Sequence, residues 1–353
     1  MQFNINPKHL HDALLHTVAE KKSALARYSH ALISAQGEAI TVTTCDGARE
    51  LEVKIPAAIK KAGSATFDVQ RLKSSLVGLE GEISVTLAGK FSSVKQGRRH
   101  FKFPSEDVEE FPTGPEMGET DATAVGIDLV ELADAIDGVA YAVPTNDPRI
   151  FLNGVALWED WVVGADGFRM AAVPLKGVPS CLIPKESVAN LTAALRSSGA
   201  ILWLGKSIEV TSDTLRFRTA LVDAKPPGYS RQLRIPDNAT TMKATSRDIK
   251  AGLARALPFA DSFGDRQTKL RRISISRDGD TGRLTAGGGD AVETFAAAFS
   301  GEWKEICLDP VFFSDAISAC GDQFEWISAS QSDQQFFIPD SSDAIHIVMP
   351  QKV

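Results

Sequence analysis

The sequence predicts an α+β protein built from three copies of one unit, in which a helix and several strands are followed by a second helix and further strands. Three observations indicate this fold class. A helix that stops at a glycine and leads into a strand recurs at intervals of roughly 120 residues. A second, amphipathic helix opens each copy, and a strand–turn–strand segment lies between the two helices.

The opening helix of each copy carries apolar residues three or four positions apart. In the second copy these are Leu129, Leu132, Ala133 and Ile136. That spacing forms one buried stripe along a helix. The three segments are NPKHLHDALLHTV, IDLVELADAIDGVAYAV and TSRDIKAGLARALPFA.

In the strand–turn–strand segments, apolar residues either alternate with polar ones or follow one another without interruption, on both sides of a turn that contains Gly and Asp. They are AITVTTCDGARELEVKI, WVVGADGFRMAAV and RLTAGGGDAVETFAAAF. Each copy is therefore expected to contain an antiparallel hairpin between its two helices.

The second helix of each copy has clear start and stop signals. Asp favours the N-cap, Pro the first helical turn, and Gly the left-handed residue that ends a helix. Asp68, Pro184 and Asp309 lie near the expected starts, and Gly81, Gly199 and Gly321 follow the expected ends.

Two segments interrupt this pattern and predict domain boundaries. Residues 111–124 and 234–245 are rich in Pro, Gly, Thr and Asp, as linkers are. Dividing the chain there gives domains at 1–118, 121–237 and 240–353. A chance recurrence of helix and strand patterns in an α+β chain is the alternative.

Composition excludes several classes of protein. A chain of 353 residues with 43% hydrophobic and 24% charged residues is typical of a globular, multidomain protein. No apolar stretch is long enough to span a membrane, and the N-terminal residues lack the pattern of a signal peptide. We therefore expect a cytoplasmic protein whose four isolated cysteines are buried free thiols.

The formal net charge of −7 argues against nucleic acid as a partner, because a surface that neutralises phosphates is usually basic. An acidic exterior can still surround a locally basic surface. The distribution of charge therefore matters more than its sum.

Longer motifs indicate a family. The segment NDPRIFLNGVALWEDWVVGADGFRMAAVPL, followed by LVDAKPPGYSRQL and the terminal IVMPQKV, resembles the bacterial DNA sliding clamp, the processivity subunit of the replicative polymerase (DNA polymerase III beta subunit). The similarity runs along the whole chain in the same order. It implies three clamp domains per chain and a head-to-tail ring dimer, with helices lining a central channel and sheets outside. It also implies a non-catalytic protein without a cofactor.

The resemblance implies that Lys and Arg on the channel helices hold duplex DNA through its phosphates, independently of sequence. The predicted DNA-binding residues are Lys21, Lys22, Arg71, Lys73, Asn146, Arg149, Lys185, Arg196 and Lys250. Each of them could instead be an ordinary solvated residue. Where the family is usually basic or neutral, the opening helix of the second copy carries Asp128, Glu131, Asp134 and Asp137. Unless these carboxylates face away from the channel, they predict a weaker hold on DNA.

The resemblance also implies a pocket for short peptide segments of the polymerase, the clamp loader and repair proteins. The predicted lining is Leu152, Ala165, Gly167, Phe168, Arg169, Met170, Pro227, Arg231, Ile347, Met349 and Pro350. Leu152 and Met170 as plain core residues is the alternative. Phe168 stands where the family commonly has histidine, and Pro226 replaces an aromatic residue, so the preference for partners is expected to differ.

Ring closure in the family joins an edge strand of the first domain to the third domain of a partner chain, which removes exposed strand edges. The corresponding residues here are Phe101 and Phe103 in the first domain and Leu257 and Phe259 in the third. A place for Phe259 in the core is the alternative.

Catalytic and metal signatures are weak. His9, His11 and His16 share a helix without the spacing of a zinc site, and the glycines at 287–289 are not followed by the Lys-Ser/Thr of a phosphate loop. Two other functions stay open. One is a clamp-fold binding protein of a mobile element with a specialised partner, and the other is an enzyme with a site between domains.

Overall fold

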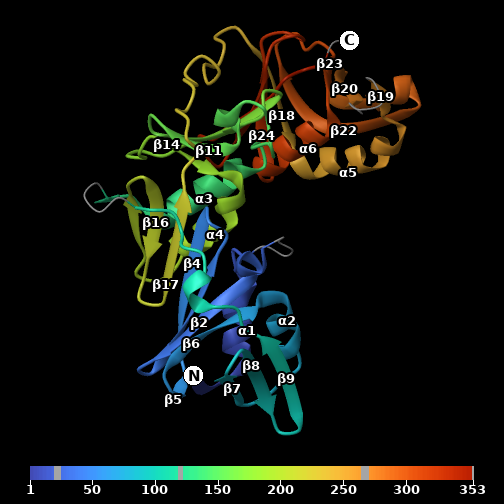
Figure 1. Ribbon diagram of the computed structural model, residues 1–353. Helices are drawn as coiled ribbons and strands as arrows, with labels where there is room; N and C mark the ends of the chain where they lie inside the picture. Colours follow the sequence, from blue (N-terminus) through green and yellow to red (C-terminus); the bar gives the residue numbers. More distant parts are fainter. Residues whose placement is uncertain (20–24, 118–121, 264–269, 352–353) are drawn as a thin grey trace. The chain divides into compact units, whose positions relative to one another are not determined.

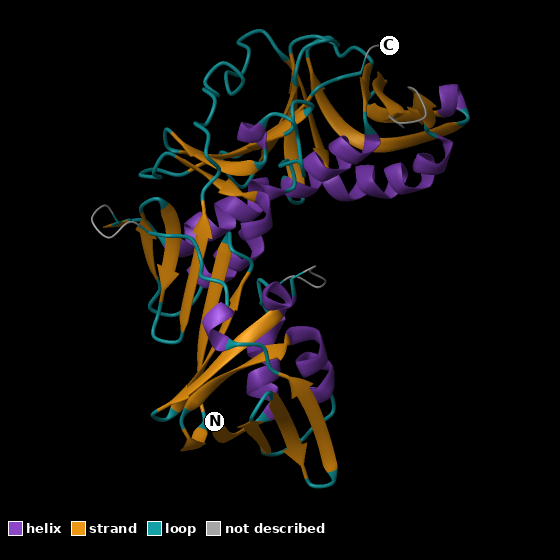
Figure 2. Ribbon diagram, in the orientation of Figure 1, coloured by secondary structure: helices purple, strands orange, loops and turns teal. Residues whose placement is uncertain are grey.

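The structure is a computed structural model that describes residues 1–19, 25–117, 122–263 and 270–351. Over these ranges it contains six α-helices and three sheets (Figures 1 and 2). The chain divides into two compact units. The first comprises Met1–Ala133 and Glu186–Leu221, and the second comprises Asp134–Lys185 and Val222–Val353. The middle third of the chain is thus shared between the two units.

The first unit contains a five-stranded antiparallel sheet in the order β5-β1-β7-β8-β9. The strands are β1 (Gln2–Ile5), β5 (Ala58–Lys61), β7 (Ile83–Ala88), β8 (Phe91–Gln96) and β9 (Arg99–Pro104). Helices α1 (Pro7–Leu15) and α2 (Val69–Leu76) pack against each other in the same unit. Strand β9 is one edge of this sheet.

An eight-stranded sheet in the first unit joins residues of the first and second copies. Its order is β10-β15-β16-β17-β4-β3-β2-β6, and β17 pairs antiparallel with β4 so that Phe217 lies opposite Leu51. The strands are β2 (His30–Gln36), β3 (Ala39–Cys45), β4 (Arg49–Pro56), β6 (Gly63–Asp68), β10 (Thr123–Ala124), β15 (Ile201–Leu204), β16 (Ser207–Thr211) and β17 (Leu215–Ala220). Helix α4 (Val188–Leu195) packs against β16 and β17.

The second unit is built on a thirteen-stranded sheet in which β13 pairs with β26, so residues of the second and third copies share it. Along the sheet the strands are β14 (Cys181–Pro184), β11 (Gly154–Trp158), β12 (Trp161–Ala165), β13 (Arg169–Pro174), β26 (Ile345–Val348), β25 (Gln335–Pro339), β24 (Gln323–Ser328), β18 (Thr240–Thr245), β22 (Ala291–Ser300), β21 (Thr281–Ala286), β20 (Leu270–Asp278) and β19 (Asp261–Phe263). Strand β23 (Ile306–Leu308) pairs with β20.

Two helices pack on this sheet. Helix α5 (Ser246–Ala256) contacts β21, β22 and α6, and α6 (Pro310–Ala319) contacts β26 and β20. Helix α3 (Leu129–Ala140) crosses the division between the two units. The opening helices predicted for the three copies are therefore present as α1, α3 and α5.

The predicted start signals of the second helices are confirmed in two copies. Asp68 caps α2 by accepting from the Arg71 amide, and Asp309 caps α6 by accepting from the amides of Val311 and Phe312. Pro184 lies near the start of the remaining such helix, α4, but not in its first turn, because it is the last residue of β14 and a 3₁₀ turn separates it from Val188, where α4 begins. Strand β14 is an edge strand, where a proline without an N–H is tolerated.

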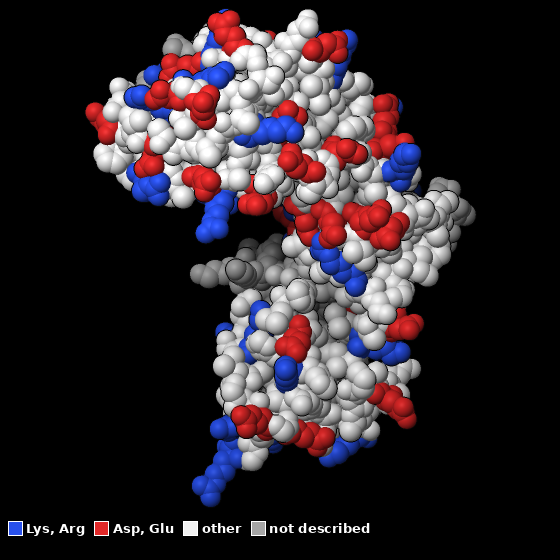
Figure 3. Space-filling view, turned by 180° about the vertical axis from the view of Figure 1, so that it is seen from behind, with Lys and Arg blue, Asp and Glu red and all other residues white. Residues whose placement is uncertain are grey.

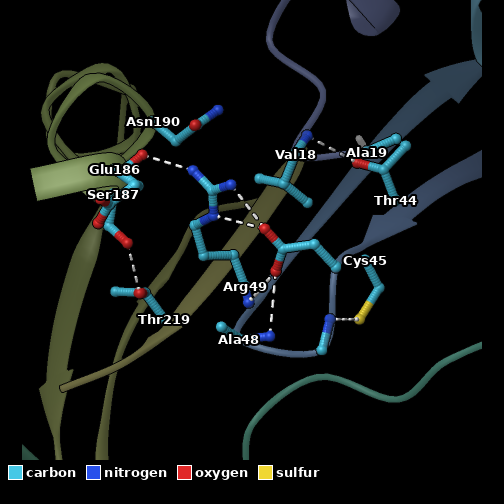
Figure 4. A network of polar contacts seen from close by, with 12 residues as sticks. Val18, Ala19, Thr44, Cys45, Ala48, Arg49, Glu186, Ser187, Asn190 and Thr219 are labelled. Atoms are coloured by element: carbon cyan, nitrogen blue, oxygen red, sulfur yellow. Dashed lines mark hydrogen bonds and ion pairs between the residues drawn. The ribbon is translucent and has the colours of Figure 1, made fainter. Parts of the chain in front are cut away.

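The three predicted hairpins are β3–β4, β12–β13 and β21–β22. The turns of the β3–β4 and β12–β13 hairpins have the same local structure. Asp46 accepts from the amide and the guanidinium of Arg49, and Asp166 does the same for Arg169. In the first unit, the Arg49 guanidinium also donates to the Glu186 carbonyl, as Figure 4 shows. The repeat is thus visible in turn chemistry as well as in the order of elements.

All four cysteines are buried free thiols, as the sequence predicts. No helix in the described ranges is long and apolar enough to cross a membrane. Across the same ranges, no group of three or more His, Cys, Asp or Glu side chains is arranged to hold a metal ion.

Candidate functional site

A cavity of about 760 Å³ in the second unit brings together most of the residues predicted for the peptide pocket. It is lined by nine of the eleven, which are Leu152, Ala165, Gly167, Arg169, Met170, Pro227, Arg231, Ile347 and Met349. Phe168 and Pro350 do not line it. Segments that are far apart in the sequence therefore meet here, as the motifs predict.

The floor of the cavity belongs to the hydrophobic core. Met170 and Ile347 are neighbours across β13 and β26, and both are packed in a core cluster with Tyr229. Their exposed fractions are 6% and 3%. Core packing and cavity lining are therefore not alternatives for these residues, because the same side chains do both.

The sheet register sets the position of the chain end. Strand β26 pairs with β13, and beyond the last strand residue the Met349 amide donates to the Phe168 carbonyl at 2.8 Å. The Met349 side chain is 40% exposed and lies at the cavity. An apolar side chain is thus held at the opening by backbone hydrogen bonds.

Arg149 forms one wall of the cavity. Its guanidinium donates to Asp147 at 2.9 Å and to the Asp166 carbonyl at 2.9 Å. The hydrogen bond from Arg149 lowers the pKa of Asp147 to about 2. Gly167 makes this arrangement possible, because a Cβ atom there would lie 2.8 Å from Arg149 Nη1 and the backbone φ of Gly167 is +90°.

Arg169 is fixed from four sides. It forms ion pairs with Asp166 and Asp315, and its guanidinium carbon lies 4.6 Å from the ring centroid of Phe312 and 5.5 Å from that of Tyr141. Arginine stacks readily on aromatic faces while it pairs with carboxylates. Its side chain is therefore a rigid part of the site.

Phe168 lies outside the cavity with 58% of its surface exposed. Its ring stacks on Phe312, with centroids 6.2 Å apart and an interplanar angle of 24°. Because Phe312 also carries the Arg169 guanidinium, the exposed ring is the outer member of an ordered stack. Phe168, which stands where the family commonly has histidine, thus places a large apolar surface beside the cavity.

The half-buried Tyr141, which contacts Arg169, pairs with a buried histidine. A hydrogen bond of 3.0 Å joins Tyr141 Oη and His346 Nδ1, and His346 is 2% exposed. Over the described residues, His346 Nε2 has no hydrogen-bond partner. Burial lowers the pKa of His346 to about 4, because a charged imidazole would lose its hydration.

Sequence reasoning missed several lining residues, among them Phe151, Gln232 and Pro236, and two parts of the lining stand out. One is Tyr229, whose ring meets Trp158 edge-on at 5.4 Å, and burial raises its pKa to about 12. The other is the turn between β24 and β25, from which Ala329, Ser332, Asp333 and Gln334 line the cavity. Tyr229 sits in the quoted segment LVDAKPPGYSRQL and could have been found there, whereas the polar turn carries no motif.

The candidate DNA-binding residues of the first unit are only partly described. Lys21 and Lys22 lie outside the described residues. Arg71 is exposed on α2, Lys73 is half-buried there, and Arg196 is exposed at the C-cap of α4. Their role in DNA binding stays a prediction.

The candidate DNA-binding residues of the second unit have diverse surroundings. Asn146 is exposed in a left-handed conformation with φ of 59°, and Lys250 is exposed on α5. Lys185 donates to the Ala140 carbonyl, and Arg149 lies in the cavity wall. For Arg149 the structure thus adds a second possible role beside the predicted one.

The four carboxylates predicted for the second opening helix are all exposed, three of them on α3 and Asp128 directly before it. Asp128 caps the helix by accepting from the amides of Val130 and Glu131. The helix therefore presents an acidic face to solvent. Elsewhere, on the face seen in Figure 3, acidic and basic residues are interspersed in both units.

The predicted dimer-interface residues differ in burial. Phe103 on the edge strand β9 is 3% exposed and meets Phe67 edge-on at 5.7 Å, while Phe101 is half-buried. In the second unit, Leu257 is half-buried and Phe259 is 51% exposed in a 3₁₀ turn. A core position for Phe259 is therefore excluded.

Comparison with known proteins finds similarity over the full length. A beta sliding clamp of Caulobacter vibrioides is 21% identical over 398 aligned positions, with 100% of both chains covered. A beta sliding clamp of Treponema pallidum is 22% identical, with 95% of this chain and 94% of that one covered. The solved structure of DNA polymerase III subunit beta from Pseudomonas aeruginosa has a TM-score of 0.86 at 21% identity, with 100% of both chains covered. No protein-family model matches the chain.

The fold is therefore that of a sliding clamp, with three repeats of one α+β unit per chain. In sequence, the chain is similar to beta sliding clamps along its whole length, at 21–22% identity. The resemblance predicted from its motifs is confirmed.

Proposed function

We propose that this protein is a DNA sliding clamp, in which two chains close into a ring around duplex DNA and tether a replicative polymerase and other DNA-processing partners. The observation that carries the proposal is similarity to beta sliding clamps along the whole chain, in sequence and in fold. The cavity in the second unit supports it independently, because nine residues chosen by motif alone line one site.

Ring closure is proposed to use β9 of one chain and the region of Phe259 of the other. Among the described strands, β9 pairs with β8 alone and is therefore a sheet edge, and Phe259 is an exposed aromatic side chain. Pairing two such surfaces removes a liability for aggregation and forms a closed assembly. The predicted domain boundaries at 118–121 and 237–240 belong to this proposal.

The proposed mechanism is topological. A closed ring cannot leave circular DNA sideways, so its contacts with phosphates can be weak and independent of sequence. Exposed cations such as Arg71 and Lys250 are proposed to supply these contacts. The acidic face of α3 opposes them if it faces the DNA, which predicts weak binding. The phosphate contacts that remain make this binding salt-dependent.

The cavity is proposed to receive short peptide segments of partner proteins, among them the polymerase, a clamp loader and repair proteins. A preformed apolar floor with a polar rim suits a few aliphatic or aromatic anchors. The exposed stack of Phe168 on Phe312 favours a specialised partner. A clamp-fold binding protein of a mobile element that serves such a partner is the second reading.

We further propose that the chain itself catalyses no reaction and needs no cofactor. ATP would be consumed by a separate loader. A bacterial protein that encircles DNA must share a compartment with the chromosome, so its proposed location is the cytoplasm.

Two measurements test the proposal. Sedimentation should give about twice the chain mass of 37.9 kDa, and a mass of one chain contradicts ring closure. For the pocket, Met349→Ala should weaken binding of a labelled leucine- and phenylalanine-containing peptide roughly tenfold, because an anchor contact is lost. Val292→Ala, at an exposed valine that does not line the cavity, is the control. Equal affinity of Met349→Ala and the parent removes the pocket assignment.

A further inference from the structure

One wall of the cavity carries a negative charge, which apolar anchors of a peptide would not contact favourably. The turn between β24 and β25 contributes Asp333 to the lining, together with Ser332 and Gln334. Asp333 is exposed, so its carboxylate is accessible to a bound ligand.

The turn is held in place from the protein core. Gln335 is fully buried, and its side-chain oxygen accepts from Trp326 Nε1 at 2.9 Å. Its amide nitrogen donates to the carbonyls of Asp333 at 2.6 Å and Ser330 at 2.9 Å. Asp333 is therefore positioned by the core before any ligand arrives.

Two further hydrogen bonds complete the arrangement. Ser330 Oγ donates to Asp333 Oδ2 at 2.8 Å and so orients the carboxylate. Gln334 Nε2 donates to the Gln232 carbonyl at 3.0 Å, which ties the turn to the neighbouring wall of the cavity. A preorganised group loses little side-chain entropy when it forms an ion pair.

The charges around the cavity differ in whether they are paired. Of the arginines that line the cavity, Arg149 and Arg169 each have a carboxylate partner, whereas Arg231 is exposed and forms no ion pair within the described residues. Asp333 forms no ion pair with any Lys, Arg or His of the described residues. The carboxylate is thus fixed at the edge of an apolar site and is available to a cation of the ligand.

We infer that the partner peptides of this cavity carry a lysine or arginine beside their apolar anchors, and that this cation pairs with Asp333. The inference rests on the proposed peptide-binding function and specifies the class of partner. Charges at the rim of an interface contribute mainly to specificity and association rate, so a basic residue selects among peptides that share the same apolar anchors.

The test uses the full-length protein and fluorescein-labelled hexapeptides that contain two leucines and a phenylalanine. Lys, Gln or Glu is scanned through the remaining three positions, and Kd is measured by fluorescence polarisation. At one or more positions, Lys should bind about threefold to fivefold more tightly than Gln, as expected for a partly exposed ion pair. The preference should shrink in 0.5 M NaCl because salt screens the pair.

Variants identify the carboxylate. Asp333→Asn should abolish the preference for Lys, and Asp333→Lys should convert it into a preference for Glu. Asp343→Asn is the matched control, because it removes the same charge from an exposed residue of the second unit that does not line the cavity. It should leave the preference unchanged.

The outcomes separate this inference from the proposed function. If the parent binds all the peptides with equal affinity, the peptide pocket stands and the inference is overturned. A preference for Lys that survives in Asp333→Asn also overturns it. If the parent binds none of the peptides, both the pocket and the inference fail.

Discussion

Replacing His346 should change how the stability of the second unit depends on pH. This side chain is 2% exposed, its Nδ1 is joined to Tyr141 Oη, and burial lowers its pKa from 6.5 to about 4. In the unfolded chain the same imidazole takes up a proton near pH 6.5. Between pH 6.5 and about 4, the unfolded state therefore binds a proton that the folded state does not bind.

The sign and size of this pH dependence follow from the linkage between proton binding and folding. Because the unfolded state binds more protons, the free energy of unfolding falls as the pH falls through this window. At 1.36 kcal/mol per pH unit, the full interval costs roughly 3 kcal/mol, and the cost at pH 5 is about 2 kcal/mol. Above pH 7 the His346 contribution to this dependence vanishes.

Tryptophan fluorescence can follow the second unit alone. The chain has five tryptophans, and only Trp203 lies in the first unit. Urea unfolding of Trp203→Phe should therefore be compared with that of Trp203→Phe/His346→Phe at pH 7.5 and 5.0. Between these values the single variant should lose about 2 kcal/mol more than the double variant, since other titrating groups are common to both.

The comparison has a clear negative outcome. If both variants lose the same stability between pH 7.5 and 5.0, His346 is not a buried neutral imidazole, and the reasoning from its surroundings is wrong. A lower stability of the double variant at pH 7.5 is expected, because it lacks the hydrogen bond to Tyr141.

Three other predictions concern the second unit. Gly164→Ala should destabilise it by about 1–3 kcal/mol in urea unfolding, since a Cβ there would lie 2.4 Å from the Val139 carbonyl oxygen. Gly138→Ala on α3 makes only an ordinary contact at 3.7 Å and should be neutral or stabilising; an equal loss in both variants would contradict the steric argument. The Cys181 and Cys320 thiols, whose pKa burial raises to about 12, should react with a disulfide reagent at pH 8 only after urea unfolding, and rapid labelling of the native chain would show that they are accessible.

Much of the fold could be predicted because it depends on local patterns. The apolar spacing around Leu132 and the caps at Asp68 and Asp309 are properties of short segments, and the structure confirms each of them. Pro184 ends an edge strand just before α4 and does not lie in the first helical turn, and the sequence does not distinguish these two places. Proline is tolerated at both.

The site was predictable only where a motif marked it. Residues of β13 and the chain end were found because their motifs survive, although Met170 and Ile347 are 177 positions apart. The turn around Asp333 was missed, since its place in the cavity depends on sheet order and on Gln335, which is anchored by Trp326. Nothing local in a polar turn reveals such a tertiary contact.

The central claim, that the protein holds DNA by encircling it, is tested most directly by retention on circular and linear DNA. Labelled protein would be loaded onto a nicked plasmid with a bacterial clamp loader and ATP, and then passed through a gel-filtration column before and after a single restriction cut. A closed ring predicts co-elution with the circular plasmid and loss from the linear one. Equal loss from both, or equal retention on both, would contradict the account.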